Sequence, residues 1–497
     1  MFKKILIVFI VFMVICSGSI TYSAITATSL RESMMNNPNV KTNKGESFCW
    51  HAAYGISRFQ WGYEAFKDSS WLDEAIKYYD WLISKMDTAP DGYKGWIGPY
   101  MYDEKVLSDC HVGDAILIGP MLRFAETVLK DPVLKSKYEK KANEYVELAK
   151  KHLIEKWDKR NSWFEDGSFG FYAVQQMFID PSKPNEWIYQ KEKQKSLPYN
   201  KQEYMGRCIL RLYRITGEQF YKDRAIKLFS LIKSRFRFFD NMYVLNYWEP
   251  FALFDIDMEN ARPVHWVNVH PNPGYAASEV EGIVECYHTG LVFSEEDIKR
   301  LVNTNLWMWN KSMKDIHFKS SGGYEKNKEG RDAGVLWSSL VDFDSTLRQI
   351  YELQLKNDEI GMAYFKNVII KRPVSFKRRY VKDTVELSDI PITKSKDITF
   401  AAAIPTIIDT GRQERMVLIC KVHGTGELKV KLISEDGKFF LDLLTEDIKD
   451  FDTDGLKSFY LKVFDGKDSS GKTVPSGNYK VQWTLKNDLR EVSIAIK

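Results

Sequence analysis

The 497-residue chain has few of the features that would direct it to a membrane, to nucleic acid or to a disulfide-stapled scaffold. Its formal net charge is only +4, and two of those charges belong to Lys3 and Lys4 at the start. Such a balance gives no general attraction to an acidic polymer. Beyond the first residues no apolar run is long enough to cross a bilayer. We therefore expect neither nucleic acid nor, after removal of a leader, a membrane as a partner.

Cysteine is scarce, and the residues that are present stand alone. Cys16 lies near the start, and the remaining five are Cys49, Cys110, Cys208, Cys286 and Cys420. No Cys-x-x-Cys pair and no zinc spacing occurs among them. An odd number of cysteines in a chain long enough to build its own core favours buried free thiols, with one disulfide left open.

The first residues have the layout of an export signal. Lys3 and Lys4 precede the apolar run Ile5–Ile15, and small and polar residues follow through Thr21–Ala27. This order is typical of a secretory signal peptide, because about eleven apolar residues are too few to span a bilayer. We predict a signal peptide over residues 1–27 and a secreted, periplasmic or cell-surface protein, with an uncleaved anchor as the alternative.

A recurring unit of paired amphipathic helices followed by a polar, aromatic loop dominates the chain. Helical spacing of apolar residues occurs in Trp71–Met86, Ala115–Leu129, Gln202–Thr216, Gly217–Arg235, Glu279–Gly290 and Glu295–Trp309. In Gln202–Thr216, for example, Met205, Ile209 and Leu212 share one face. The loops richest in chemistry are Asp91–Asp114, Trp163–Tyr172, Tyr243–Pro273 and Ser320–Asp332. Helical hairpins whose polar loops gather at one end describe a toroid with a cleft.

Aromatic residues make up 14% of the chain, and many lie in these loops. They include Trp96, Tyr100, Tyr102, Trp163, Phe169, Tyr172, Tyr247, Trp248, Trp266 and Tyr275. Aromatic rings exposed in a cleft stack on the apolar C–H faces of sugars, so a carbohydrate chain is the expected ligand. Packing of the loops onto the helices is the competing interpretation for more than half of these rings.

The pattern changes near the C-terminus. Helical spacing continues to residue 370, a basic segment without periodicity covers 371–396, and short alternating runs fill 397–497. The runs are Met416–Val422, Glu427–Ile433, Lys457–Val463, Asn478–Leu485 and Val492–Ile496. They predict a small antiparallel β-sandwich. The chain thus divides into a signal peptide (1–27), a toroid catalytic domain (28–370), a linker (371–396) and a β-sandwich domain (397–497).

Two stretches carry family resemblances. Phe464-Asp465-Gly466 through Val474-Pro475-Ser476-Gly477 resembles the Ig-like repeat of the flagellar hook-capping protein family, which implies an accessory module without catalysis. The element Leu210-x-Leu212-Tyr213-x-x-Thr216-Gly217-x-x-x-Tyr221 is similar to a helix pair in the (α/α)-toroid carbohydrate enzymes. That superfamily includes polysaccharide lyases, glucuronyl epimerases and six-hairpin glycosidases. The resemblance implies the architecture, mainly α, and leaves the reaction open.

His111 is the first candidate for chemistry. It follows Asp109-Cys110 and is predicted to open a helix, with Asp114 one turn further on. A histidine there can act as a general base, and Asp114 would orient it. A His-x-Gly step before an apolar helix also resembles these toroids. In the alternative interpretation Asp109 caps the helix and His111 bonds a backbone carbonyl.

Three glutamates are candidate catalytic acids. Glu203 stands three residues after Asn200, and Glu281 three residues after Ser278, which is the spacing of a helix capping box. The same positions at a cleft would suit catalytic carboxylates. Glu279 has no capping explanation.

The densest constellation lies on one predicted loop that enters a helix. It comprises Arg262, His265, Trp266, His270, Asn272 and Tyr275. Its histidine spacing matches no standard zinc motif, so catalytic and binding groups are favoured over a metal. Further candidates for substrate binding are Tyr204, Trp248, Glu249, Tyr324 and Arg331.

These residues fit two reactions and one binding role. Proton abstraction and β-elimination on a uronate-containing saccharide would use His111, His270 and Tyr275, and is the preferred reading. A glycoside hydrolase would use two of the carboxylates Glu203, Glu249, Glu279, Glu281 and Asp114. A non-catalytic carbohydrate-binding protein is the third reading. No cofactor is expected, and an assisting divalent cation is left open.

Overall fold

The computed structural model describes residues 25–174, 177–190, 194–239, 241–269, 273–308, 316–319, 323–326, 336–381, 384–386, 393–394, 397–450 and 458–497. The predicted signal peptide falls almost wholly outside these ranges, so it stays a prediction.

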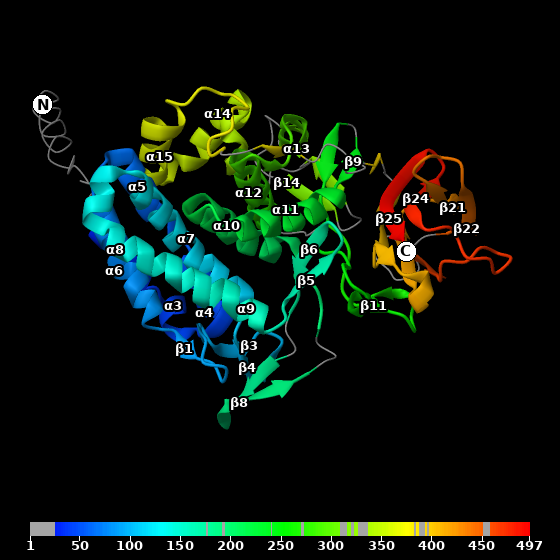
Figure 1. The fold of residues 1–497 in the computed structure, drawn as a ribbon. Coiled ribbons are helices and arrows are strands. Elements are labelled where there is room, and N and C mark those ends of the chain that lie inside the picture. The colour runs from blue at the N-terminus through cyan, green and yellow to red at the C-terminus, as the bar shows by residue number, and fades with distance from the viewer. Residues whose placement is uncertain are drawn as a thin grey trace, which may run out of the picture.

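Helices form the larger part of the molecule, on the left in Figure 1. Their bounds are α2 Ala27–Met35, α3 Pro38–Thr42, α4 Gly45–Ala53, α5 Ser57–Phe66, α6 Ser70–Ile83, α7 His111–Lys130, α8 Pro132–Ala149, α9 Lys156–Lys159, α10 Tyr199–Thr216, α11 Gln219–Ser234, α12 Pro273–Thr289, α13 Glu295–Met308, α14 Ser345–Gln354 and α15 Glu359–Tyr364. The six helices named from periodicity are confirmed. Helices α2 to α5, α8 and α9 were not among the predicted ranges.

Four of these helices stand side by side in chain order. Helix α4 packs on α7, α7 on α10, and α10 on α12. A cavity of about 180 Å³ is lined by residues of α5, α7, α10, α12, α14 and α15 and of the 3₁₀ turn Ser338–Asp342. Residues of these six helices therefore surround this space, and the predicted mainly helical architecture is confirmed.

Helix α10 shows how the sequence builds the ring. Met205, Ile209 and Leu212 are fully buried, as the helical spacing predicts. Gly217 ends the helix with a φ of +75°, a left-handed conformation that glycine adopts without steric cost. Tyr221 then packs into the core from α11.

Short strands occupy the loops between helices. They are β1 Asp87–Thr88, β2 Lys94–Gly95, β3 Gly98–Tyr100, β4 Asp103–Ser108, β5 Trp163–Asp166, β6 Phe169–Tyr172, β7 Met177–Asp180, β8 Lys183–Tyr189, β9 Arg237–Phe239, β10 Met242–Val244, β11 Ile256–Asp257, β12 Arg262–Pro263, β13 Leu291–Val292, β14 Ile316–Lys319 and β15 Gly323–Lys326. The sheet β3-β4-β7-β8 projects below the helices in Figure 1. The predicted loops are thus partly hairpins.

The C-terminal part consists of two sheets on a common core. Its strands are β18 Ile398–Ile404, β19 Ile407–Ile408, β20 Met416–Val422, β21 Gly426–Ser434, β22 Phe440–Ile448, β23 Phe459–Phe464, β24 Gly477–Leu485 and β25 Asp488–Ile496. One sheet has the order β18-β20-β23 and the other β19-β25-β24-β21-β22. All five predicted strands are confirmed, and β18, β19 and β22 are additional. The Ig-like identity of this region stays a prediction.

The predicted linker is attached to the ring. Ser375 N donates to Asp342 O at 2.9 Å, and Tyr380 N donates to His288 O at 2.8 Å. Two short strands follow, β16 Val385–Glu386 and β17 Thr393–Lys394, which pair with β13 and β9.

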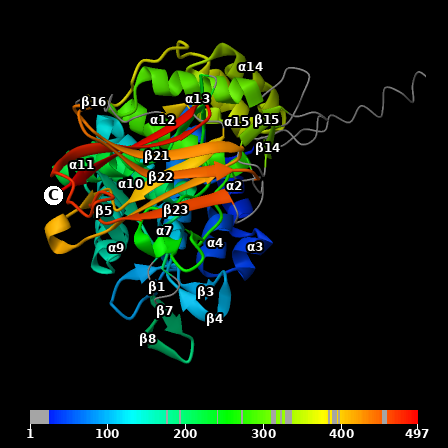
Figure 2. The ribbon, with the colours of Figure 1, turned by 90° about the vertical axis from the view of Figure 1, so that its right-hand side faces the viewer.

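The two-sheet region packs directly against the helical ring, and its strands lie across the front of the molecule in Figure 2. Trp248 and Val267 from a ring loop share a hydrophobic cluster with Phe400 and Ile419. Lys421 Nζ donates to the carbonyl of Val267 at 3.0 Å. The C-terminal region therefore supports the loop that carries several predicted site residues.

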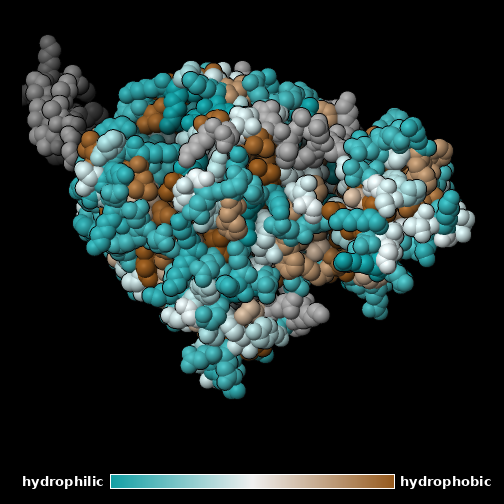
Figure 3. Space-filling view, viewed as in Figure 1, coloured by the Kyte–Doolittle hydropathy of each residue, from teal (hydrophilic) through white to brown (hydrophobic). Residues whose placement is uncertain are grey.

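The surface in Figure 3 is mostly hydrophilic, with apolar residues scattered over the helical part. Within the described ranges, no helix combines the length and the apolar character needed to cross a bilayer.

Candidate functional site

A small cavity lies where α4, α7 and α10 begin, and it has about 60 Å³ of free space. Its wall is formed by Glu46, Tyr100, Tyr102, Ser108, Asp109, Cys110, His111, Val174, Met177, Phe178, Lys195, Ser196, Leu197, Pro198, Lys201, Tyr247 and His265. Because the first turns of three neighbouring helices meet here, their N-terminal dipoles favour carboxylates at this end.

Aromatic rings form one side of the cavity. The centroid of Tyr100 lies 4.8 Å from that of Phe178 and 5.5 Å from that of Tyr102. On the other side Tyr247 lies 6.4 Å from His265 and 5.3 Å from Tyr275. Tyr102 is 69% exposed at the rim. This arrangement is suited to stacking on the apolar face of a sugar.

Glu46 and Lys201 form an ion pair on the cavity wall. Lys201 Nζ lies 2.7 Å from Glu46 Oε1, and Cys110 Sγ lies 3.0 Å from Glu46 Oε2. Burial alone would raise the pKa of Glu46, but the charge and hydrogen bond of Lys201 hold it below its usual value. Glu46 is therefore ionised at neutral pH. Neither residue was among the predicted site residues, although Glu46 precedes an apolar helical run.

Asp109 and Asp114 belong to a buried ion network behind the cavity. Lys156 Nζ lies 2.9 Å from Asp109 and 2.6 Å from Asp114, and Arg160 lies 2.7 Å from Asp109. Asp114 also accepts from Trp157 Nε1 at 2.9 Å, and burial raises its pKa to about 7. The predicted cap by Asp109 is wrong, since the helix has no side-chain cap. Asp114 contacts Lys156 and Trp157 as hydrogen-bond partners, so the structure does not support its predicted role beside His111.

His111 opens α7 as predicted and lines the cavity. Its ring stacks on Trp157 with centroids 3.7 Å apart, and Nε2 has no partner within the described part of the chain. Burial, with the nearby charge of Lys156, lowers its pKa well below the usual value. The imidazole is therefore neutral at pH 7.

Glu203 and Glu279 are buried carboxyls on the adjacent helices α10 and α12. Both oxygens of Glu203 and Oε1 of Glu279 lack hydrogen-bond partners among the described residues. Burial raises the pKa of both groups well above the usual value, and Glu279 raises that of Glu203 further. Gly282 leaves the necessary room, because a Cβ there would lie 1.8 Å from Glu203 Oε2. This end of the ring thus holds two carboxyl groups whose protonated form is favoured by burial.

Glu279 lies within electrostatic reach of the cavity. Burial raises the pKa of Tyr247, and the charges of Lys201 and Glu279 act on the same phenol with opposite sign. Tyr247 also lines the cavity. Glu279 itself is only 2% exposed and does not line the cavity.

The predicted capping boxes do not form. Helix α10 begins at Tyr199 without a side-chain cap, and the Asn200 side chain has no hydrogen-bond partner in the described chain. Ser278 lies inside α12 and donates to Tyr275 O at 2.8 Å. Glu281 instead pairs with Arg207 at 2.5 Å. The predicted site residue Tyr204 packs edge-on against Trp50 at 5.7 Å.

Three of the predicted binding residues occupy other places. Trp248 is fully buried and donates from Nε1 to Ser196 O at 2.8 Å, so it offers no ring for stacking. Glu249 is fully buried and accepts from Asn246 at 2.7 Å and Tyr199 at 3.2 Å. Arg262 pairs with Asp257 on the β11–β12 hairpin beside strand β23. Local polarity and aromaticity predicted exposed side chains for Trp248 and Glu249, but tertiary packing buries both.

Of the remaining predicted site residues, some lie in the described part of the chain and others do not. His265 lines the cavity, and burial and the charge of Lys195 lower its pKa to about 4. Trp266 is 37% exposed and lies 6.5 Å from Tyr247. His270, Asn272 and Arg331 lie outside the described residues, as does the side chain of Tyr324 on β15. The described residues contain no cluster of three or more His, Cys, Asp or Glu suited to a metal ion.

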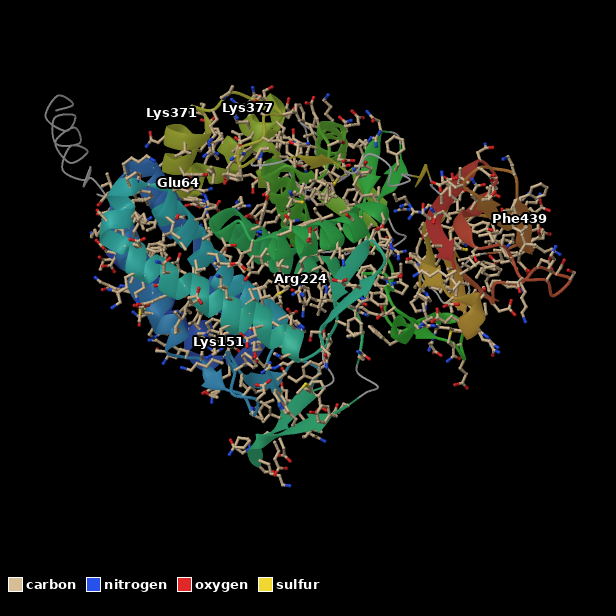
Figure 4. All side chains as sticks on the ribbon, viewed as in Figure 1. Glu64, Lys151, Arg224, Lys371, Lys377 and Phe439 are labelled. Atoms are coloured by element: carbon tan, nitrogen blue, oxygen red, sulfur yellow. The ribbon has the colours of Figure 1, made fainter. Side chains whose placement is uncertain are left out.

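The opposite end of the ring is rich in paired arginines. Arg214 binds Glu126 through two hydrogen bonds of 2.7 and 2.8 Å and Glu285 at 2.8 Å, while Arg211 binds Glu285 at 2.8 Å. Figure 4 shows Glu64 at this upper end, near α15. Glu64 pairs with Arg123 at 3.0 Å.

No protein-family profile and no curated protein matches this chain. Among solved structures, a family 76 glycoside hydrolase (mannosidase) of Bacteroides thetaiotaomicron shares 15% identity, with 66% of this chain and 71% of that chain covered and a TM-score of 0.36. An inactive α-1,6-mannanase variant of Salegentibacter sp., in complex with α-1,6-mannotetrose, shares 15% identity over 68% and 83% of the chains, with a TM-score of 0.33. These TM-scores are too low to establish a common fold.

Proposed function

We propose that the protein is an exported glycoside hydrolase acting on an oligosaccharide or polysaccharide. The observation that carries this proposal is the contrast between two carboxyl groups at one end of the ring. Lys201 holds the pKa of Glu46 below its usual value, whereas burial raises the pKa of Glu279 well above its usual value. Two carboxyls whose surroundings separate their protonation states are what acid-assisted hydrolysis of a glycosidic bond requires.

In this mechanism Glu279 donates a proton to the glycosidic oxygen, and the ionised Glu46 either activates water or attacks the anomeric carbon. Rings of Tyr100, Tyr102 and Tyr247 hold the sugar. Because Glu279 is buried behind the cavity wall, the proposal requires substrate binding to open a path past Tyr247.

A second candidate function is β-elimination on a uronate, and one observation supports it. His111 is on the cavity wall, neutral at pH 7 and without a partner on Nε2 among the described residues, so it can accept a proton. The carboxylate-neutralising groups first expected for this reaction do not gather at the cavity. Arg262 binds Asp257, and Asn272 and Arg331 lie outside the described residues.

The test is incubation of the mature protein with neutral and uronate-containing oligosaccharides, scored for new reducing ends and for absorbance near 235 nm. The panel includes α-1,6-mannan oligosaccharides, the ligands of a solved neighbour. New reducing ends without absorbance, lost in Glu279→Gln, support hydrolysis. A rise in absorbance that depends on His111 supports elimination instead. Silence in both assays across the panel contradicts the enzyme proposal.

A further inference from the structure

Lys195 stands on the cavity wall without a carboxylate partner in the described part of the chain, unlike Lys201, the other lysine of the wall. Lys201 is paired with Glu46, whereas no acidic group of the described residues lies within ion-pair distance of Lys195. Its Nζ lies 5.2 Å from the centroid of Tyr102, at the exposed rim. Burial and the charge of Lys201 lower the pKa of Lys195, which marks a cation in unfavourable surroundings.

The nearby acids are already engaged by other groups. Asp255, whose charge raises the pKa of Lys195, accepts from Ser196 N at 2.8 Å, Ser196 Oγ at 2.6 Å and Phe251 N at 2.8 Å. Asp109 is bound by Lys156 and Arg160. A half-buried cation without a counter-ion lowers the stability of the fold. The anionic group of a bound ligand would supply that counter-ion.

We infer that Lys195 binds the anionic group of an acidic sugar, whose ring stacks on Tyr102 and Tyr100. The substrate class is therefore a uronate-containing or sulfated saccharide. This inference rests on the proposed function for the cavity as a saccharide site and goes beyond it by naming the charge of the sugar. The cation at the rim and the rings beside it match the two faces of such a residue, one charged and one apolar.

The test is binding, measured by calorimetry at low salt with the unmutated protein and three variants. The probes are trigalacturonate, its neutral methyl ester, a sulfated galactan trisaccharide and α-1,6-mannotriose. The variants are Lys195→Met, Lys195→Arg and the control Lys140→Met, an exposed lysine on the outer helix α8. We expect trigalacturonate or the sulfated trisaccharide to bind about tenfold or more tightly than the neutral probes.

Lys195→Met should remove that preference while Lys195→Arg retains most of it and Lys140→Met changes nothing. Which acidic probe binds better distinguishes carboxylate from sulfate. Equal affinity for acidic and neutral probes, or an unchanged preference in Lys195→Met, overturns the inference and leaves hydrolysis of a neutral glycan intact. Activity that survives in Glu279→Gln, with the acidic preference preserved, would contradict the proposed hydrolysis mechanism and leave the inference about Lys195 intact.

Discussion

The two ends of the helical ring carry charges in opposite ways. Where α4, α10 and α12 begin, Glu203 and Glu279 are buried without hydrogen-bond partners among the described residues, and burial raises the pKa of both. Where α7, α10 and α12 end, Glu126 and Glu285 are buried in bidentate arginine pairs and stay ionised. Helix dipoles explain the signs, since they favour acids at the start and arginines at the end. They do not explain why the carboxyl groups of Glu203 and Glu279 lack hydrogen-bond partners among the described residues.

The difference indicates that the paired end stabilises the fold and that the unpaired end serves the chemistry. A fully paired buried network fixes the geometry of the ring, and removing one partner leaves an uncompensated charge. Unpartnered acids reduce stability and are retained where they act on a ligand. Substitutions matched between the two ends test this contrast.

Exchanging a glutamate for glutamine at each end should have the largest and most divergent effect. Glu279→Gln should lower kcat by about 10²–10⁴-fold, because the proton donor is lost, and it should raise the free energy of unfolding at neutral pH, because the buried acid that opposes folding there is removed. Glu126→Gln should leave kcat per folded molecule unchanged and reduce stability. The measurements are initial rates on the best substrate and urea unfolding of both variants. Equal loss of kcat in both would break the contrast.

Arg214→Met should be the most destabilising change at the paired end. It leaves Glu126 and Glu285 without their shared partner, at a cost of about 3–5 kcal/mol in the free energy of unfolding. Arg412→Met is the control, because Arg412 is exposed and its pair with Asp409 at 3.3 Å lies on the surface. That variant should stay within about 0.5 kcal/mol of the unmutated protein. Similar losses in both variants would mean that the network adds nothing.

Stability should depend on pH with opposite sign at the two ends. Burial opposes ionisation of Glu126, but Arg214 lowers its pKa to about 2, below the unfolded value of about 4.3. Its contribution is therefore complete above about pH 4.3 and is lost as the pH falls toward 2. Glu279 has its pKa raised, so it destabilises the fold increasingly as the pH rises above about 4.3.

Urea unfolding between about pH 3 and 8 measures both slopes. Glu126→Gln should remove the rise in stability on the acid side, worth about 3 kcal/mol. Glu279→Gln should remove the fall toward neutral pH. A wild-type slope that persists in Glu279→Gln and Glu203→Gln would show that these acids are ionised in the folded protein.

The periodicity of apolar residues predicted the helices and strands better than it predicted the residues of the candidate site. Apolar spacing located α10 and the five C-terminal strands because burial of one face follows directly from sequence. It could not tell which polar residues face the cavity. Trp248 and Glu249 look like a binding pair in sequence, yet contacts with Ser196 and Asn246 bury both. Glu46 escaped notice because its partner Lys201 lies 155 residues away.

Glu203 and Glu279 were predicted as candidate catalytic acids near the starts of helices, but the structure gives a different reason for their special environment. The capping spacing of Asn200 and Glu203 suggested a local hydrogen bond, whereas Pro198, two residues before Asn200, is the N-cap of helix α10, and the glutamate faces α12. Long-range packing therefore decides whether a carboxyl near a helix start is satisfied.

Gly282→Ala should give the smallest change and sharpen the role of the unpaired acids. The added Cβ would lie 1.8 Å from Glu203 Oε2, so the carboxyl must move or α10 and α12 must separate, at about 1–3 kcal/mol. Combining it with Glu203→Ala frees the space, and the double variant should recover most of that loss. Recovery would mean that the strain lies at the carboxyl itself. If stability does not recover, the helices pack too closely at Gly282 for reasons independent of Glu203, and its burial is then a consequence of ring packing with no connection to the chemistry of the cavity.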